Sequence, residues 1–161
     1  DKILQIDTTK VLGASGEFSD RASFTDYVKA NIALKKYRSG LEISTKAAAS
    51  WIRSELAAGL RKRMMQVNLL LGGVDKDTGA ASLYWMDYLG SLHKMNFGCH
   101  GYCANFLLST LDRHWKEGMT EEEGLDVVRL CIKELQTRFL LTQKRFLVKI
   151  VTKEGVRLVE L

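Results

Sequence analysis

Three groups of side chains in this sequence could support chemistry, and the first surrounds His100. Cys99 and Cys103 flank this histidine, which suggests a thiolate–imidazole pair or a metal site. A structural zinc ion takes four ligands, and no fourth ligand lies nearby in the sequence. We therefore interpret His100 as a packed or hydrogen-bonded residue. The cysteines, Cys131 included, are interpreted as reduced hydrophobic residues, and neither a metal nor a cofactor is predicted.

The second group consists of carboxylates and the third of threonines. Asp87 and Asp112 could each belong to a carboxylate dyad, but neither has a second acid near it in the sequence. We predict that both form hydrogen bonds in a turn or at a helix end. Thr8 and Thr9 have hydroxyl groups, but an inner threonine has no free amine to act as its base. The sequence therefore predicts no catalytic residue.

Charge and hydropathy narrow the classes of partner. The 161-residue chain has a formal net charge of +5, and its basic residues form small groups at 35–38, 61–63 and 144–145. Two of these groups end predicted helices, where cations are stabilised by the helix dipole. No aromatic residues alternate with them to stack bases, so we expect no nucleic-acid partner. No apolar run reaches the roughly 20 residues of a membrane span, and we expect a soluble protein of the cytoplasm and nucleus.

The beginning of the sequence predicts two strands followed by a long helix. The strands are expected at residues 3–6 and 10–16, on either side of a polar turn. Ser19 or Asp20 can cap the helix, which should end near Arg38. One face of this helix carries the residues that we expect to be buried: Phe24, Tyr27, Val28 and Ile32.

A second helix is predicted from Ser44 to the basic residues at 61–63, and the short connection favours an antiparallel helix pair. The periodicity then changes to that of strands. We expect one strand at 67–74, one at 82–86, and a short one near Phe97.

The last part of the sequence predicts two more helices and a hairpin. The third helix is expected at 104–114. Thr120 and Glu123 form a capping box that starts the fourth helix, which should end near Arg138. Two apolar segments around Gly155 then predict a hairpin over residues 146–161. The order of strands and helices is typical of helices stacked on both faces of paired sheets.

Several motifs in this order resemble those of proteasome beta subunits, and the resemblance covers essentially the whole chain. The most characteristic of them is the strand pair at residues 71–76 and 83–91. The segments that carry the resemblance are 1–3, 13–16, 71–76, 83–91, 99–102, 111–113 and 134–139. Together they resemble the subunit at the fourth position of the beta ring.

The resemblance implies an α+β fold, the four-layer alpha-beta-beta-alpha sandwich of N-terminal nucleophile hydrolases. It implies a single beta-type domain over residues 1–161 that lacks its first strand hairpin, which would lie upstream of Asp1. The partners implied are other beta subunits of the same and the opposite ring, together with the subunits of the alpha ring. No membrane partner is expected.

The family's catalytic machinery can be compared with this sequence. Active subunits use an N-terminal threonine, and that residue, a lysine and a first aspartate are expected upstream of Asp1. Active subunits also have a Gly-Ser-Gly loop, which corresponds to Gly101-Tyr102-Cys103 here, so tyrosine replaces serine. After the fourth helix they have an Arg-Asp pair and a serine. The corresponding segment 138–142 has Phe139 and Thr142 in place of the aspartate and the serine.

These differences lead us to expect a non-catalytic structural subunit that contributes to the wall of the proteolytic chamber. The alternative is a truncated active threonine peptidase subunit, which a processed N-terminal threonine in the full-length protein would support. A basic nucleic-acid-binding domain unrelated to proteasomes is a third alternative, and it predicts salt-sensitive binding to DNA or RNA.

Overall fold

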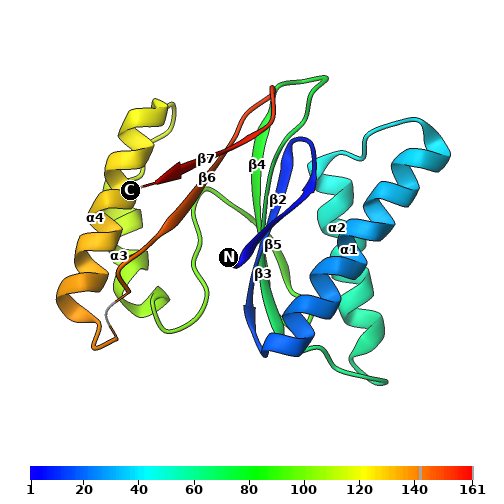
Figure 1. The fold of residues 1–161 in the computed structure, drawn as a ribbon, viewed down its shortest axis with the longest axis horizontal. Helices are drawn as coiled ribbons and strands as arrows, with labels where there is room; N and C mark the ends of the chain where they lie inside the picture. Colours follow the sequence, from blue (N-terminus) through cyan, green and yellow to red (C-terminus); the bar gives the residue numbers. More distant parts are fainter. Residues whose placement is uncertain (142, 161) are drawn as a thin grey trace. The chain divides into compact units, whose positions relative to one another are not determined.

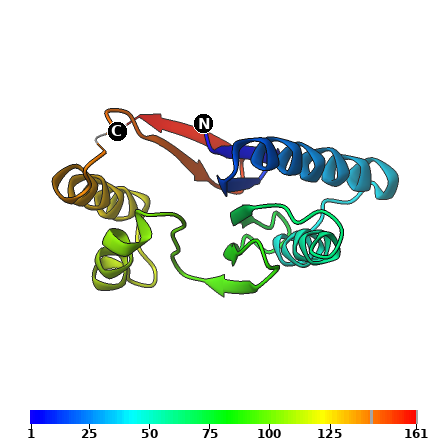
Figure 2. The same cartoon turned by 90° about the horizontal axis from the view of Figure 1, so that it is seen from below.

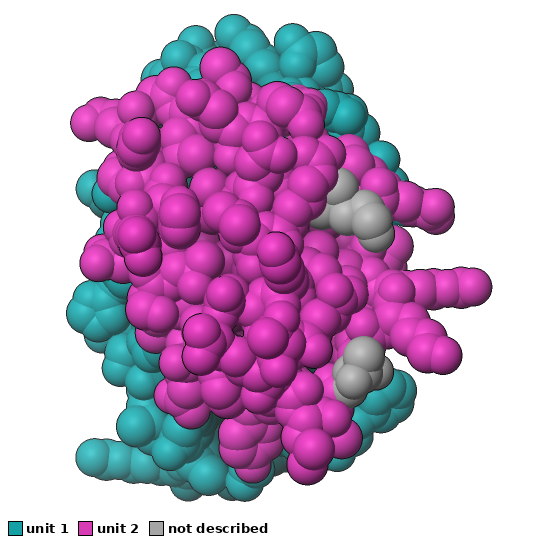
Figure 3. Space-filling model, turned by 90° about the vertical axis from the view of Figure 1, so that its left-hand side faces the viewer, with its two compact units in different colours: residues 1–96, 149–158 teal, residues 97–148, 159–161 magenta. Residues whose placement is uncertain are grey.

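The computed structural model describes residues 1–141 and 143–160 (Figure 1). The described residues form two compact units, 1–96 with 149–158 and 97–148 with 159–161, which are coloured separately in Figure 3. The prediction of one domain over residues 1–161 stays a prediction. In chain order, the elements are β1 (Ile3–Asp7), β2 (Lys10–Gly16), α1 (Phe18–Ser39), α2 (Thr45–Gly59), β3 (Val67–Val74), β4 (Ala81–Met86), β5 (Leu92–Met95), α3 (Ala104–His114), α4 (Glu121–Arg138), β6 (Leu147–Val151) and β7 (Val156–Glu160).

The first unit is built on an antiparallel sheet in which the strands follow their order in the chain, from β1 to β5. Helices α1 and α2 lie on one face of this sheet (Figures 1 and 2). α1 contacts β1 and β2, whereas α2 contacts β3, β4 and β5. The two helices are consecutive in the chain, and Tyr27 of α1 stacks on Trp51 and donates a hydrogen bond to Glu55 of α2, so the predicted contact between the helices is confirmed.

The hydrophobic core of this unit lies between the sheet and the helix pair. Leu12, Leu71 and Tyr84 are opposite one another on β2, β3 and β4, and all three are buried. The next residues along these strands, such as Leu70 and Trp85, are only partly buried. This alternation follows from the two-residue period of a strand, which turns successive side chains to opposite faces.

Two glycines of the sheet stand where a side chain would collide with neighbouring atoms. A Cβ at Gly73 would lie 2.6 Å from the Oγ1 atom of Thr45 and 2.9 Å from Cγ of Lys10. Gly16 has a φ of +123°, and a Cβ there would lie 2.1 Å from the carbonyl oxygen of Gln66. The end of β2 and the approach of α2 to β3 therefore depend on glycine.

The start of α1 differs from its prediction. Neither Ser19 nor Asp20 caps the helix; Glu17 does, and its carboxylate accepts a hydrogen bond of 2.7 Å from the Asp20 amide. The Asp20 carboxylate instead accepts a hydrogen bond of 2.9 Å from the amide of Gln66, which precedes β3. The predicted burial of Tyr27 is also wrong, because its side chain is 45% exposed.

Two further boundaries need correction. α2 begins after its predicted cap, Ser44, but ends at Gly59, so the basic residues at 61–63 follow the helix rather than finish it. The short strand expected near Phe97 is β5, which ends two residues earlier at Met95. It pairs with β4, so the predicted meander is present.

The second unit contains α3 and α4, which pack against each other. The bounds of α3 agree with the prediction, and α4 begins with the predicted capping box. Thr120 Oγ1 accepts a hydrogen bond from the Glu123 amide, and the Glu123 carboxylate accepts one of 2.7 Å from the Thr120 amide. β6 and β7 form the predicted hairpin, a separate two-stranded sheet of which residues 149–158 belong to the first unit; Leu161 lies outside the described residues.

Candidate functional site

The loop before α3 contains Tyr102 at the position expected to replace a catalytic serine. Its side chain is 81% exposed. Gly101, which precedes it, has a φ of +79°, a conformation that favours glycine. The Cys103 thiol is engaged in the same turn, where it donates a hydrogen bond of 3.1 Å to the carbonyl oxygen of His100.

Two of the three cysteines of this unit are unsuited to nucleophilic chemistry. Burial, together with the neighbouring Cys103 and Cys131, raises the pKa of the Cys99 thiol to about 11. Burial also raises the pKa of Cys131. Such thiols are protonated at neutral pH, whereas the thiolate is the nucleophile and the metal ligand. Within residues 1–141 and 143–160, no cluster of three His, Cys, Asp or Glu side chains could hold a metal ion.

The end of α4 contains Phe139, where active relatives are expected to have a carboxylate. The Phe139 amide donates a hydrogen bond of 2.9 Å to the carbonyl oxygen of Leu135. Its ring packs edge-on against Phe106 of α3, with 5.8 Å between centroids and an interplanar angle of 65°. The benzyl group thus belongs to the packing between the two helices, and it offers no proton acceptor. Thr142 lies outside the described residues.

The threonines of the turn between β1 and β2 have no free amine, and their hydroxyls do not form a reactive centre. Thr8 donates a hydrogen bond of 3.2 Å to the Glu42 carboxylate. Thr9 is completely buried, and its hydroxyl has no hydrogen-bond partner among the described residues. Because a completely buried hydroxyl cannot meet a peptide, Thr9 is excluded as a nucleophile.

A network of charges surrounds this turn and joins it to the helix pair. Glu42 accepts hydrogen bonds of 2.8 Å from the ammonium groups of both Lys36 and Lys76. These two lysines lower the pKa of the Glu42 carboxyl to about 2, with Lys36 making the larger contribution. The buried Lys10 lies 3.5 Å from the Asp7 carboxylate. The opposite charges offset one another, so the network is suited to holding the loops together rather than to catalysis.

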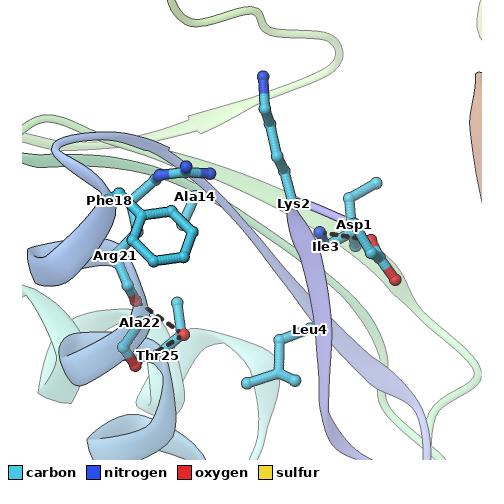
Figure 4. Close-up of a pocket in the computed structure, with 9 residues that line it drawn as sticks. All are labelled: Asp1, Lys2, Ile3, Leu4, Ala14, Phe18, Arg21, Ala22 and Thr25. Carbon is cyan, nitrogen blue, oxygen red and sulfur yellow. Dashed lines mark hydrogen bonds between the residues drawn. The ribbon is translucent and has the colours of Figure 1, made fainter.

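A pocket of about 190 Å³ lies between the start of the chain, β2 and the first turns of α1 (Figure 4). The Arg21 guanidinium lies over the Phe18 ring, 5.5 Å from its centroid. The Nε atom of Arg21 is buried and has no hydrogen-bond partner among the described residues. Both side chains come from α1. The residues that line the pocket are Asp1, Lys2, Ile3, Leu4, Ala14, Phe18, Arg21, Ala22 and Thr25.

The pocket combines an apolar lining with charged groups of both signs, the carboxylate of Asp1 and the cationic groups of Lys2 and Arg21. The Thr25 hydroxyl is the one aliphatic hydroxyl in the lining, and it donates hydrogen bonds to the carbonyl oxygens of Arg21 and Ala22 (Figure 4). The Asp1 carboxylate, the one carboxylate of the lining, accepts hydrogen bonds from the Ile3 amide and the Lys149 ammonium group rather than from Thr25. This pocket could not be predicted from the sequence, because its residues come from separate elements and share no motif.

Asp87 and Asp112 are the remaining residues that were considered for chemistry. Asp87 accepts hydrogen bonds of 3.0 and 2.8 Å from the amides of Leu89 and Ser91, so its predicted role in a turn is confirmed. Asp112 is exposed on α3, and the described structure gives it no hydrogen bond. The hydrogen bond predicted for Asp112 at a helix end is therefore not found among the described residues. None of the described helices is both long enough and apolar enough to span a bilayer.

Comparison with known proteins identifies the family. Residues 1–151 match the family model described as "Proteasome subunit". The chain is 49% identical to proteasome subunit beta type-2 of Dictyostelium discoideum, over 98% of this chain and 80% of that protein. It is 46% identical to subunit beta type-2-B of Arabidopsis thaliana, over 98% of this chain and 78% of that protein. It is 41% identical to subunit beta type-4 of Saccharomyces cerevisiae, over 99% of this chain and 81% of that protein.

These matches confirm the resemblance and the predicted α+β fold class, since helices and antiparallel sheets are present as the family fold requires. The relatives named above are beta subunits of type 2 or type 4, and each similarity extends over nearly the whole of this chain. The chain therefore belongs to the proteasome subunit family, and within it to the beta subunits.

Proposed function

We propose that this chain is a non-catalytic structural subunit of the beta ring of the 20S proteasome core, which takes part in protein degradation through assembly. Family membership supports the role in the ring. The environments of three residues that were considered for a catalytic role support the lack of catalysis. Tyr102 is exposed in its loop, Phe139 is packed in a helix interface, and the Thr9 hydroxyl is buried.

The packing of Phe139 against Phe106 is the observation that carries this proposal. A carboxylate at this place could hold a proton or stabilise an ammonium group in a hydrolytic site. An aromatic ring does neither. Its edge-on contact with another ring instead contributes about 0.5–1.5 kcal/mol beyond the burial of its area. The position thus serves the packing of α3 against α4.

The partners in this proposal are the neighbouring beta subunits of the same ring, beta subunits of the opposite ring and subunits of the alpha ring. We include neither a nucleic acid nor a membrane among them. The proposed location is the cytoplasm and the nucleus, as expected from the sequence. The chain would contribute to the wall of the chamber, and its pocket would be a surface without hydrolytic groups of its own.

Peptide hydrolysis by the full-length gene product tests the lack of catalysis. We expect the purified protein to turn over no fluorogenic peptide and to form no adduct with an epoxyketone. A Phe139→Asp variant should remain equally inactive, because one carboxylate does not supply a nucleophile. In core particles that contain the chain, the reagent should label other subunits and leave this one unlabelled. Labelling of this chain would favour the alternative, an active threonine peptidase subunit.

Native mass spectrometry tests the role in assembly separately. Co-expression with other proteasome subunits should give complexes that contain this chain in defined stoichiometry. Binding to a labelled DNA or RNA duplex at low salt serves as the contrasting measurement, since non-specific binding is strongest there. A chain that stays monomeric with every subunit offered, or that binds the duplex tightly, would contradict the proposal.

A further inference from the structure

A second pocket of the first unit, of about 400 Å³, lies between α2 and the edge strand β5. This is the size of a small-molecule site. The pocket shares no residue with the one beside Arg21, and it contains none of the residues that were considered for catalysis. Its lining comes from α2, from the turn after β4 and from β5. The lining residues are Ser50, Arg53, Gly90, Ser91, Leu92 and His93.

Arg53 supplies the charge of this pocket. Its Nε atom donates a hydrogen bond of 3.1 Å to the carbonyl oxygen of Gly90. The remaining N–H groups of the guanidinium have no acceptor among residues 1–141 and 143–160, and no described carboxylate forms an ion pair with them. A guanidinium presents its N–H groups as a rigid fork that matches two oxygens of one anion. Arg53 is thus free to bind an anion in the pocket.

Neutral donors lie beside the guanidinium. The described structure gives no hydrogen-bond partner to the hydroxyls of Ser50 and Ser91. The Leu92 amide is a further donor. The Asp87 amide donates a hydrogen bond of 3.3 Å to the Ser91 carbonyl oxygen, and hydrogen-bonded pairs alternate along an antiparallel ladder. In the next pair, Met86 with Leu92, the Leu92 N–H therefore points away from β4 towards the edge of the described sheet.

The sign of the charge in the pocket favours an anion. No described carboxylate lines it. The nearest acid in the sequence is Asp87, whose Oδ1 atom accepts hydrogen bonds of 3.0 and 2.8 Å from two amides of its own turn. Leu92 contributes the one large apolar side chain of the lining. A cation would meet no opposite charge here and an apolar ligand would leave the donors unpaired, whereas an anion satisfies them.

Close packing holds the walls of the pocket in place. Gly90 is buried with a φ of +82°, and a Cβ there would lie 3.4 Å from the Cβ atom of Ala57. The turn thus rests directly on α2, and the hydrogen bond from Arg53 fixes the guanidinium against it. Donors that are held in position before binding lose little freedom on binding. The His93 ring lies against Trp85, with 6.2 Å between centroids, so we assign it no role.

We propose that this pocket binds a phosphate group. Arg53 is the charged donor, and the hydroxyls of Ser50 and Ser91 and the Leu92 amide are the neutral donors. A phosphate group presents at least three acceptor oxygens to such a set, whereas a carboxylate presents two. The group belongs to free phosphate or to a small phosphate ester, because the pocket also has room for an organic part beside Leu92. The site lies within the first unit, so the inference does not depend on the proposed function.

An NMR titration of the full-length protein tests the site. Inorganic phosphate and phenyl phosphate are added separately at constant ionic strength, with chloride as the balancing anion. We expect saturable shifts of the Leu92 amide signal and of the Arg53 Nε–H signal. Tighter binding of inorganic phosphate would identify the free ion as the ligand, and tighter binding of phenyl phosphate would identify an ester. The absence of saturable shifts with both compounds would overturn the proposal.

Three variants separate the site from general attraction by a basic protein. Arg53→Gln should weaken binding of the tighter compound at least about tenfold, because the charged donor is lost. Arg61→Gln removes an equal charge outside the pocket and should change affinity less than about twofold, since salt screens distant charges. Ser50→Ala combined with Ser91→Ala keeps the bond from Arg53 to Gly90 and should weaken binding at least about threefold.

The serine variant decides the case if Arg53→Gln does not fold, because it leaves the contact between α2 and the turn intact. Circular dichroism establishes which variants are folded. Equal losses of affinity in the Arg53 and Arg61 variants would show general electrostatic attraction and overturn the proposal. Unchanged affinity in the folded serine variant would overturn it as well.

Discussion

The two units differ in how much of their apolar surface they bury. In the first, Leu12, Ile52 and Leu71 are completely inaccessible between the sheet and the helix pair. In the second, the helices α3 and α4 bury Leu107, Leu125 and Cys131, while exposed apolar side chains such as Leu108 remain on their surfaces. Because hydrophobic stabilisation scales with the apolar area removed from water, the first unit should contribute more to stability.

This difference separates a densely packed region of the chain from a more loosely packed one. The first unit has a sealed core, in which residues such as Leu12 and Leu71 have no accessible surface. Both units also have exposed apolar side chains, such as Tyr37 in the first and Leu108 in the second. The Phe106–Phe139 pair belongs to the second unit and is not part of the sealed core. Four substitutions test this contrast.

The largest effect is expected from Leu71→Ala in the centre of the sheet. Leu71 has no accessible surface, so truncation loses its burial and leaves a cavity. The free energy of unfolding should fall by about 3–4 kcal/mol. Leu108→Ala in α3 is the control; this side chain is 43% exposed, and the expected change is below about 0.5 kcal/mol. Urea denaturation measures both, and equal losses would remove the contrast between the units.

Gly73→Ala sharpens the comparison by adding an atom instead of removing several. The new Cβ would approach Thr45 Oγ1 and Lys10 Cγ to under 3 Å, so the added crowding should cost about 1–3 kcal/mol. Gly124→Ala in α4 is the control, because a Cβ there meets no atom within 4 Å. It should raise stability by about 0.5–1 kcal/mol, since alanine favours the helix interior. Thermal denaturation shows whether each variant is more or less stable than the wild type. A stabilised Gly73→Ala variant would show that the packing around Gly73 is loose.

Thr120→Ala tests the local stability of the second unit. It removes the hydroxyl that accepts a hydrogen bond from the Glu123 amide, and a lost cap costs about 1 kcal/mol. Amide hydrogen exchange should rise mainly in the first turn of α4. Thr120→Ser keeps the acceptor and is the matched control. If both variants exchanged alike, the capping box would contribute nothing measurable.

Local signals explain which parts of the fold could be predicted from sequence. The capping box of α4 depends on Thr120 and Glu123, which lie within one turn of each other, so the sequence alone reveals it. The cap of α1 depends on a contact across the fold: the Asp20 carboxylate is occupied by the Gln66 amide, and Glu17 caps the helix in its place. Periodicity alone does not show a contact of this kind.

The error at Tyr27 has a similar cause. Its position next to Phe24 and Val28 on the helix suggests burial, but helical periodicity does not define how wide the buried face is. The tyrosine lies at the border of that face, where its ring contacts Trp51 and its hydroxyl contacts Glu55. The pocket beside Arg21 escapes prediction for a related reason, since β1, β2 and α1 each contribute residues to it.

At Phe139, by contrast, the residue type at a single position is informative without any knowledge of its contacts. The sequence motif shows an aromatic residue where a carboxylate is expected, and the structure adds the reason why the ring is tolerated: Phe106 packs against it. The sequence alone could not identify that partner, because Phe106 lies one helix earlier. Chemistry at one position is thus easier to predict than the contacts that support it.

The smallest effect is expected from Glu42→Gln, which removes charge from the network beside the sealed core. Its pairs with Lys36 and Lys76 are partly exposed, so the loss at pH 7 should be below about 1 kcal/mol. The pKa of Glu42 is about 2 in the folded chain, below its ordinary value of 4.5, so the stabilisation is present above pH 4.5. It should disappear as the pH falls from 4.5 towards 2, and wild type and variant should then unfold at the same urea concentration. Glu117→Gln in the second unit, with no described ion pair, should be neutral throughout; a gap between wild type and Glu42→Gln that persisted at pH 2 would show that the stabilising contribution of Glu42 is not its charge.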